Sequence, residues 1–302
     1  MNSMSLENIL EIPASQLKEI SEQAEQSYLR FPLDKGNGKK RWIEAPKREL
    51  KHIQTLLLHR VFYQKPPHPV AHGFVPNRSI VSNAKPHVGQ NWVVNFDIHN
   101  FFPSTKTKLV TDVLQRYEFF SEEDIEILLQ ICSRNGALPQ GAPTSPHLAN
   151  LALWDFDMAL WKFCLDHQLQ YTRYADDLTF SGAEIPQDLY PTVTMELKNL
   201  GYRLAKGKSS YKGQHRRQIV TGLVVNEKIN LPREKRKRLR AILHDMQQNG
   251  VQQALRRSTM ELDQLIGHIS LQMMWNEEVA QKQLQELFDV IFGQDLFATE
   301  QE

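Results

Sequence analysis

The stretch YTRYADDLTFSG, residues 171–182, constrains the fold of this chain more than any other part of its sequence. Two adjacent carboxylates, Asp176 and Asp177, separate two apolar runs that are rich in aromatic and β-branched residues. This pattern predicts two strands joined by a tight turn. Adjacent acids repel each other, so the turn is either an exposed acidic loop or part of a site that attracts positive charge.

Strands and helices alternate around this hairpin. We expect the order β-α-β-β-α-β, made of strand 92–96, helix 146–167, strands 169–174 and 178–181, helix 187–200 and a strand after Gly201. An open sheet of this order with helices on one face is an α+β architecture.

Further elements are expected on both sides of this centre. Helices are expected over 5–30, 47–64 and 105–116, from Ser121, from Pro232 onward and over 276–292, and another strand over 218–226. The first two helices flank a hairpin with its turn at Gly36-Asn37-Gly38. Ser258 and Glu261 predict a capping box in the C-terminal helical region.

The composition is that of a soluble globular protein, with 41% hydrophobic and 24% charged residues in 302. No segment approaches the roughly 20 apolar residues of a membrane span, and the N-terminus lacks the layout of a signal peptide. Cys132 and Cys164 have no CxxC companion, so we expect reduced core thiols rather than a disulfide or a zinc site. A cytoplasmic protein is expected.

The net charge of +1 hides a strongly basic segment. Residues 206–240 contain twelve Lys and Arg against Glu227 and Glu234, which makes this segment +10 and the rest of the chain −9. Such a run forms either a solvated helix face or a surface that binds phosphates.

The strand over 92–96 ends at Asp97. If that strand lies beside the hairpin, Asp97, Asp176 and Asp177 meet at one edge of the sheet. Three carboxylates in one place repel strongly unless cations lie among them, and hard oxygen ligands suit Mg²⁺. Two such ions, roughly 4 Å apart, promote an in-line displacement at phosphorus.

Five segments together resemble reverse transcriptases. YADD is similar to their catalytic hairpin, NFDIHNFFPS to their first metal-binding motif, and LPQGAPTSPHLANL to their template loop and helix. GYRLAKGKSS is similar to the lysine-bearing motif that follows, and DKGNGKKRWIEAP to the fingers hairpin. Their order along the chain is that of the family, and the combination is far more specific than any single motif.

Two shorter motifs narrow the resemblance to bacterial retron reverse transcriptases. SNAKPH places Asn83 and His87 in the NAxxH signature, and residues 220–222 match the VTG signature. The resemblance implies a right-hand polymerase fold. N-terminal helices and fingers are expected in 1–90, with the fingers continuing in part of 105–150, the palm with the catalytic site in 91–228 and a helical thumb in 229–302.

The resemblance also assigns roles near the acids. Asp97, Asp176 and Asp177 are implied as catalytic ligands of two Mg²⁺ ions, which Mn²⁺ can replace, with the backbone carbonyl of Ile98 as a further ligand. Lys208, or alternatively Lys206, is implied to neutralise or protonate pyrophosphate. Alternatively, either lysine is an exposed side chain in contact with water and has no catalytic role.

Candidate nucleotide-binding residues are implied by the same motifs. Phe102 would lie beneath the sugar and exclude a 2′-OH, although a core position for both Phe101 and Phe102 is the alternative. The other candidates are Lys40 and Arg41 for the triphosphate, and Gln140 and Gly141 against nucleotide and template.

Candidate nucleic-acid-binding residues lie elsewhere in the chain. Tyr174 is expected either at the primer end or in simple packing, and the NAxxH residues have an RNA-related or a structural role. A thumb helix would place its cations along a nucleic-acid backbone, if its apolar residues face a core. These cations are Arg233, Lys235, Arg236, Lys237 and Arg240.

The retron resemblance implies a cognate structured non-coding RNA, copied in part into DNA from the 2′-OH of an internal guanosine to give msDNA. It also implies dNTP substrates, a separate effector protein encoded nearby, and a role in defence against phage. Two alternatives stay open: another bacterial reverse transcriptase, of the group II intron or diversity-generating type, and a non-catalytic RNA-binding scaffold for an effector.

Overall fold

The computed structural model describes residues 5–34, 38 and 40–298, and the predicted turn at Gly36 and Asn37 lies outside them. The chain forms two compact units, one of Met1–Ser79 with Asn91–Gly213 and one of Ile80–Gln90 with Gln214–Glu302. The limits of the expected fingers, palm and thumb stay a prediction. Within the described residues, no helix is both long and apolar enough to cross a membrane.

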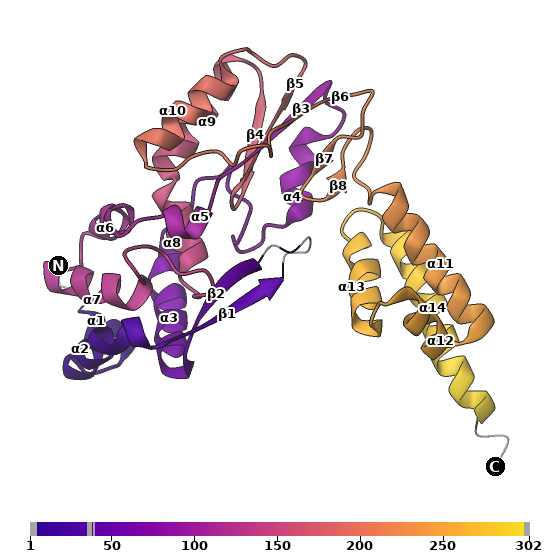
Figure 1. Cartoon of the computed structure of the whole chain (residues 1–302), viewed down its shortest axis with the longest axis horizontal. Helices are drawn as coiled ribbons and strands as arrows, with labels where there is room; N and C mark the ends of the chain where they lie inside the picture. The colour runs from indigo at the N-terminus through magenta and orange to yellow at the C-terminus, as the bar shows by residue number, and fades with distance from the viewer. Residues whose placement is uncertain (1–4, 35–37, 39, 299–302) are drawn as a thin grey trace. The chain divides into compact units, whose positions relative to one another are not determined.

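The first unit contains a four-stranded antiparallel sheet (Figure 1). Its strands lie in the order β4-β5-β3-β6, which are Gln170–Tyr174, Asp177–Gly182, Trp92–Asp97 and Ser210–Gly213. Helix α9, Trp154–Asp166, packs against β4, and α10, Leu189–Asn199, packs beside α9. The predicted α+β class and the order β-α-β-β-α-β are therefore confirmed.

The N-terminal region contains short helices and a separate two-stranded sheet. Its elements are α1 (Leu6–Leu10), α2 (Ala14–Gln23), η1 (Ala24–Gln26), β1 (Tyr28–Asp34), β2 (Lys40–Pro46), α3 (Arg48–Arg60) and η2 (Phe62–Gln64). The single helix predicted over 5–30 is wrong, because Glu11 adopts a left-handed φ of 58° and Pro13 begins a new helix as its N-cap. Strand β1 pairs along its whole length with β2.

Helices between β3 and β4 contribute many buried residues to the core. They are α5 (Phe101–Ser104), α6 (Thr107–Gln115), α7 (Glu122–Cys132), α8 (Ser145–Ala152) and α9. Ser121 caps α7 in a capping box with Asp124, as expected. The long helix predicted from Pro146 is instead broken at Leu153, whose ψ of 10° leaves the helical range.

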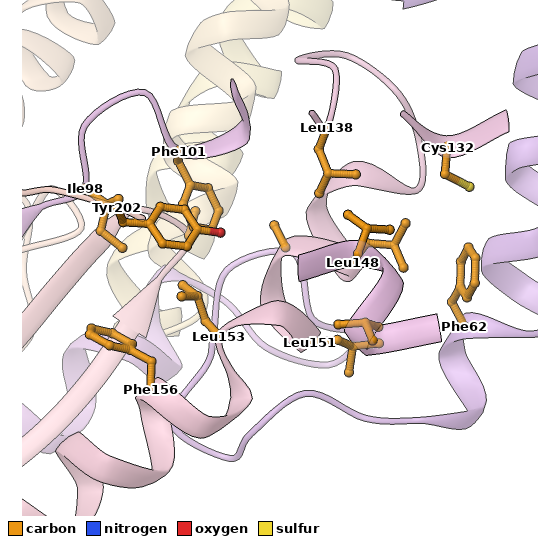
Figure 2. Packing of buried hydrophobic residues seen from close by; sticks show 14 of the residues in the cluster. Phe62, Ile98, Phe101, Cys132, Leu138, Leu148, Leu151, Leu153, Phe156 and Tyr202 are labelled. Carbon is orange, nitrogen blue, oxygen red and sulfur yellow. The ribbon is translucent and has the colours of Figure 1, made fainter. Parts of the chain in front are cut away.

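The break at Leu153 lets two helices bury apolar faces in one cluster. Leu148 and Leu151 of α8 lie on one side of Leu153 and Phe156 of α9 on the other, and all four belong to the same core (Figure 2). Cys132 and Cys164 are free and buried in this unit, as expected for core thiols.

The second unit is mostly helical. Its elements are α4 (Ile80–Ala84), η3 (Lys85–His87), β7 (Ile219–Val220), β8 (Leu223–Val224), α11 (Arg233–Asn249), α12 (Val251–Ser258), α13 (Leu262–Gln272) and α14 (Glu277–Ala298). The single strand predicted over 218–226 is wrong: Thr221 and Gly222 have φ of 46° and 82°, and make a two-residue hairpin turn. The capping box of α13 is formed by Glu261 with Gln264, rather than by Ser258.

Candidate active site

The pairing of β3 with β5 places two acids opposite each other at the end of the sheet. Asp97 is the direct antiparallel partner of Asp177. Tyr174 of β4 also pairs with Asp177, so Ala175 and Asp176 form a two-residue turn between the strands. The Ile98 N–H donates to the Asp176 carbonyl at 2.9 Å, which ties this turn to the end of β3. Asp97, Asp176 and Asp177 thus share one edge, although their separation in sequence is large.

Burial and mutual repulsion perturb the acids of the turn. Burial is the main reason that the pKa of Asp177 rises to about 6, and the charges of Asp176 and Asp97 raise it further. Burial likewise raises the pKa of Asp176, with a smaller contribution from Asp97. Lys208 opposes both shifts, and its Nζ lies 2.6 Å from Asp97 Oδ2.

A cation is the natural partner for this cluster of oxygen donors. Burial and the neighbouring acids raise the pKa values of Asp176 and Asp177 although Lys208 acts in the opposite direction, and a bound cation would favour the charged form of both acids. Among residues 5–34, 38 and 40–298, however, no three His, Cys, Asp or Glu side chains converge as a formed metal site. Lys208 holds Asp97 in an ion pair instead, so a metal would have to displace the Nζ of Lys208 from that carboxylate. The donor set, being all oxygen, fits Mg²⁺ or Mn²⁺.

The two candidate lysines differ in where they lie. Lys208 reaches Asp97 from the turn after Ala205, whose N–H donates to the Asp97 carbonyl at 2.7 Å. Lys206 is exposed in the same turn. Gly207 separates the two with a φ of 72°. Of the two, Lys208 is therefore the lysine that contacts the acidic edge.

Comparison with known proteins decides the family. The family described as reverse transcriptase (RNA-dependent DNA polymerase) matches residues 33–223. The Retron Ec86 reverse transcriptase of Escherichia coli is 34% identical over 230 residues, which cover 73% of this chain and 70% of that protein. The chain belongs to the retron reverse transcriptase family.

Other relatives extend over more of the chain. The Retron Mx65 reverse transcriptase of Myxococcus xanthus is 34% identical over 274 residues, 84% of this chain. This match spans 63% of the length of that relative. Among solved structures, telomerase from Candida albicans in complex with a fragment of telomeric RNA aligns with a TM-score of 0.48 at 10% identity, over 92% of this chain and 60% of that chain.

The two phenylalanines after β3 face different surroundings. Phe101 is 5% exposed and stacks on Tyr202, with ring centroids 6.2 Å apart. Phe102 is half-buried, and its ring centroid lies 6.2 Å from that of Phe74, which is 49% exposed. The ring centroid of Tyr174 also lies near that of Phe74, at 6.5 Å. Phe102 and Tyr174, two candidates of this retron-family chain, therefore both lie near the exposed ring of Phe74.

The fingers candidates lie on β2 and on the loop packed against it. Lys40 and Arg41 are exposed on β2, and the charge of Arg41 opposes a part of the rise in the pKa of Asp176. The Gln140 carbonyl accepts from the Glu44 N–H at 2.9 Å. A Cβ at Gly141 would meet the Glu44 carbonyl oxygen at 2.9 Å, so the close approach at Gly141 is to β2 itself.

The two retron signatures pack against each other in the second unit. Asn83 and His87, of the NAxxH motif, are both completely buried in α4 and η3. Thr221, of the VTG motif, donates from Oγ1 to the Ile80 carbonyl at 3.0 Å. The Gly89 N–H donates to the carbonyl of Val225 at 2.9 Å. Burial of both side chains favours the structural alternative for this motif over direct contact with nucleic acid.

Helix α11 has an apolar face and an exposed basic face. Leu239, Ile242, Leu243 and Met246 are buried, which confirms the expected core-facing stripe. The five candidate cations of this helix are all exposed: Arg233, Lys235, Arg236, Lys237 and Arg240.

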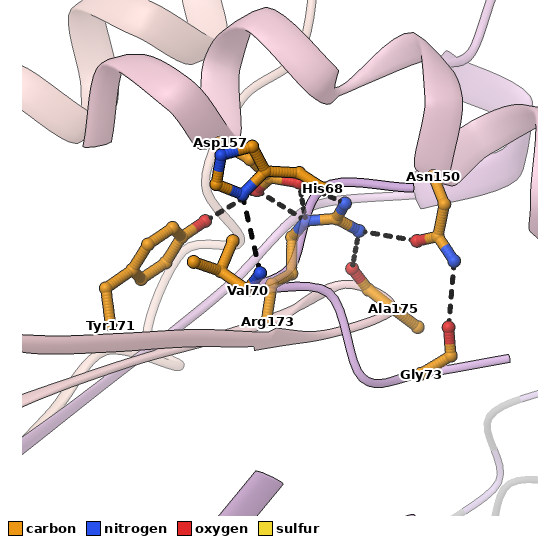
Figure 3. Close-up of polar contacts among 8 residues, drawn as sticks. All are labelled: His68, Val70, Gly73, Asn150, Asp157, Tyr171, Arg173 and Ala175. Carbon is orange, nitrogen blue, oxygen red and sulfur yellow. Dashed lines mark hydrogen bonds and ion pairs between the residues drawn. The ribbon is translucent and has the colours of Figure 1, made fainter. Parts of the chain in front are cut away.

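Sequence reasoning missed a buried polar cluster directly beneath the acidic turn (Figure 3). Arg173 is completely buried and contacts Asp157, Asn150 and the Ala175 carbonyl. An arginine in a strand next to an acidic turn is ordinarily taken as exposed. One signal was present: Asp157 lies between the apolar residues Phe156 and Leu160 of a helix, where a buried charge requires a partner.

Proposed function

We propose that this chain is an RNA-directed DNA polymerase. The observation that carries the proposal is the direct pairing of Asp97 with Asp177, with Asp176 in the adjoining turn and Lys208 at 2.6 Å from Asp97. Membership in the retron reverse transcriptase family supports the same activity. RNA is the proposed template and dNTPs are the proposed substrates.

Two Mg²⁺ ions are the proposed cofactors, and Mn²⁺ is a substitute. Asp97 and Asp176 would hold them, with Asp177 in support and the backbone carbonyl of Ile98 as a further donor. When bound, the ions would supply activation of the attacking hydroxyl and stabilisation of the leaving pyrophosphate. Lys208, 59% exposed at its side chain, carries a cation that is free to turn from Asp97 toward pyrophosphate and neutralise or protonate it.

The remaining candidates position the nucleotide and the nucleic acid. Phe102 would exclude the 2′-OH of a ribonucleotide, and Lys40 and Arg41 would contact the triphosphate. Gln140 and Gly141 would lie against the nucleotide and the template, and Tyr174 would lie at the primer end. The exposed cations of α11 would contact phosphates along the RNA, which positions it without reading its sequence.

Retron-type chemistry is the finer proposal. The chain would copy part of a cognate structured non-coding RNA into msDNA, with priming from the 2′-OH of an internal guanosine. A separate effector protein and a role in anti-phage defence in the cytoplasm complete this proposal. It is supported by the similarity to curated retron reverse transcriptases and by the NAxxH and VTG motifs.

Primer extension on an RNA template tests the polymerase proposal. The wild-type chain is expected to incorporate dNTPs, and the double variant Asp176→Asn with Asp177→Asn is expected to lose incorporation while still binding RNA. Equal incorporation by both would refute the assigned site. No incorporation by either, with RNA binding retained, would favour a scaffold for an effector.

Sequencing the nucleic acid that copurifies with the chain tests the retron proposal. We expect a structured RNA joined to DNA, encoded beside the gene for this chain. RNA of unrelated sequence with no attached DNA would leave a general reverse transcriptase rather than a retron enzyme.

A further inference from the structure

Arg173 lies under the acidic turn and bonds in three directions (Figure 3). Its Nε and Nη2 donate to Asp157 at 2.8 and 2.5 Å, which makes a two-pronged ion pair. Its Nη1 donates to Asn150 Oδ1 at 2.8 Å and to the Ala175 carbonyl at 3.1 Å. The side chains of Arg173 and Asp157 are both 0% exposed. One guanidinium therefore joins two helices, α8 and α9, to the backbone of the turn.

Stability alone does not account for this cluster. Removing two charges from water costs several kcal/mol, and a buried ion pair is often no more stabilising than apolar side chains of the same volume. The planar fork of arginine suits a site in which several acceptors must be held in fixed directions. Tyr171 completes the cluster by donating to Asp157 Oδ1 at 2.9 Å, on the side away from the turn.

The carbonyl that Arg173 binds belongs to the most constrained residue of the turn. Ala175 has a φ of 57°, a left-handed conformation that costs roughly 1–2 kcal/mol for a residue with a Cβ. That carbonyl belongs to the peptide bond between Ala175 and Asp176. The bond from Arg173 therefore fixes the orientation of the peptide from which the Asp176 side chain departs.

Segment 70–73 holds the same turn from another side. The Arg173 N–H donates to the Val70 carbonyl at 2.8 Å, and the His72 N–H donates to the Arg173 carbonyl at 2.7 Å. Gly73 follows so closely that a Cβ there would lie 2.4 Å from the Ala175 nitrogen. Asn150 Nδ2 donates to the Gly73 carbonyl at 2.8 Å, so the side chain that accepts from Arg173 also anchors this segment.

We propose that Arg173 is a positioning residue for the acidic edge. Acting through the Ala175 carbonyl and Asn150, it holds the turn in the conformation that presents Asp176 and Asp177 for cation binding. This inference rests on the proposed polymerase function, because it concerns the same acids, but it assigns a role to residues that make no contact with substrate.

Mn²⁺ binding to the whole chain without RNA or dNTP tests this role directly. Arg173→Lys keeps a cation for Asp157 but lacks the planar fork that reaches Ala175 and Asn150 together. We expect it to bind Mn²⁺ about tenfold more weakly than wild type, in electron paramagnetic resonance titrations. Its maximal rate of dNTP incorporation under single-turnover conditions is expected to fall by about ten- to a hundredfold. The dNTP concentration that gives half of this maximal rate is expected to change little.

Two further variants separate positioning from folding. Tyr171→Phe removes a bond of the same cluster that does not reach the turn, and is expected to keep wild-type Mn²⁺ affinity. A triple variant combines Tyr171→Phe with Asp157→Leu and Arg173→Met. It leaves no buried charge unpaired, so it is expected to fold. It is nevertheless expected to show the same weakened Mn²⁺ binding as Arg173→Lys.

The possible results lead to different conclusions. Wild-type Mn²⁺ affinity and turnover in a folded Arg173→Lys or triple variant would overturn the positioning role, as would failure of both variants to fold. A wild-type chain that binds Mn²⁺ but incorporates no dNTP would instead refute the proposed function, and the comparison of Mn²⁺ affinities would still decide the role of Arg173.

Discussion

At the scale of single residues, three influences set the pKa values of the acids at this edge: burial, repulsion between the carboxylates and the charge of Lys208. Burial and neighbouring acids raise the pKa of Asp177 to about 6, while Lys208 acts in the opposite direction. A divalent cation would relieve the same repulsion more completely than one ammonium group. The affinity for a cation should therefore depend on both the proton on Asp177 and the ion pair of Lys208.

The first prediction concerns pH. Because the folded-state pKa of Asp177 is raised to about 6, the metal-free chain carries a proton there below that pH. A cation must displace this proton, so Mn²⁺ affinity should be constant above about pH 7 and should fall by up to about tenfold per pH unit below pH 6. Mn²⁺ titrations across this range measure the effect. Asp177→Asn should abolish the transition, and its persistence in that variant would assign it to another group.

The second prediction concerns Lys208, which competes with a metal for Asp97. Lys208→Met should bind Mn²⁺ more tightly in the absence of nucleotide, because the ion pair at 2.6 Å no longer opposes it. The same variant should lose about a hundredfold or more in single-turnover dNTP incorporation, the scale of a lost general acid. Lys206→Met, in the same turn, is the matched control and should change neither quantity. An unchanged turnover in Lys208→Met would leave this lysine with no part in the reaction.

At the scale of secondary-structure elements, local signals predicted some features and tertiary packing decided others. The hairpin around Asp176 and the cap at Ser121 follow from short-range chemistry, and both were predictable. The break at Leu153 was not, because nothing in its immediate sequence interrupts helical spacing. With the break, α8 and α9 both bury apolar residues in one core.

The Arg173 cluster shows the same limit for the site. Three of its members lie on different elements, and the contacts of Arg173 with Asn150 and Asp157 span 23 and 16 residues of sequence. The order of strands predicted that Asp97 would lie near the turn, since pairing follows from topology. No local pattern predicts which helix residues will lie beneath a turn, so this supporting cluster required the structure.

The third prediction concerns the loop that packs on β2. Gly141 has a φ of 137° and no space for a side chain, since its Cβ would lie 2.9 Å from the Glu44 carbonyl oxygen. Gly141→Ala should lower the free energy of unfolding by roughly 1–3 kcal/mol, in denaturant titrations. Gly136→Ala is the matched control, because its φ of 71° is also left-handed but nothing lies within 4 Å of its Cβ. Equal losses in both variants would mean that close packing on β2 contributes nothing.

At the scale of the whole molecule, the acids of the candidate site and the basic face of α11 belong to different compact units. The acidic edge lies in the first unit, and the exposed basic face of α11 lies in the second. Cations that contact RNA phosphates release counterions, so they set the salt dependence of binding rather than its sequence preference.

The fourth prediction concerns this salt dependence. Arg236→Gln with Arg240→Gln should reduce the slope of log affinity for RNA against log salt concentration by about 1.4–1.8 and should leave Mn²⁺ binding unchanged. RNA binding measured across salt concentrations gives the slope. Lys282→Gln, an exposed cation on α14, serves as the control and should alter the slope little. An unchanged slope in the double variant would show that this face of α11 is simply solvated.

The central claim is tested most directly by comparing RNA-templated dNTP incorporation by the wild type and by Asp97→Asn. Both chains are first shown to unfold at the same temperature. Asp97 lies on a different strand from the acidic turn, and only the pairing of β3 with β5 brings it there. The wild type should incorporate dNTPs, and Asp97→Asn should lose roughly a thousandfold in rate, equivalent to about 4 kcal/mol of transition-state stabilisation. Incorporation at the wild-type rate by Asp97→Asn would contradict the assignment of this edge as the active site.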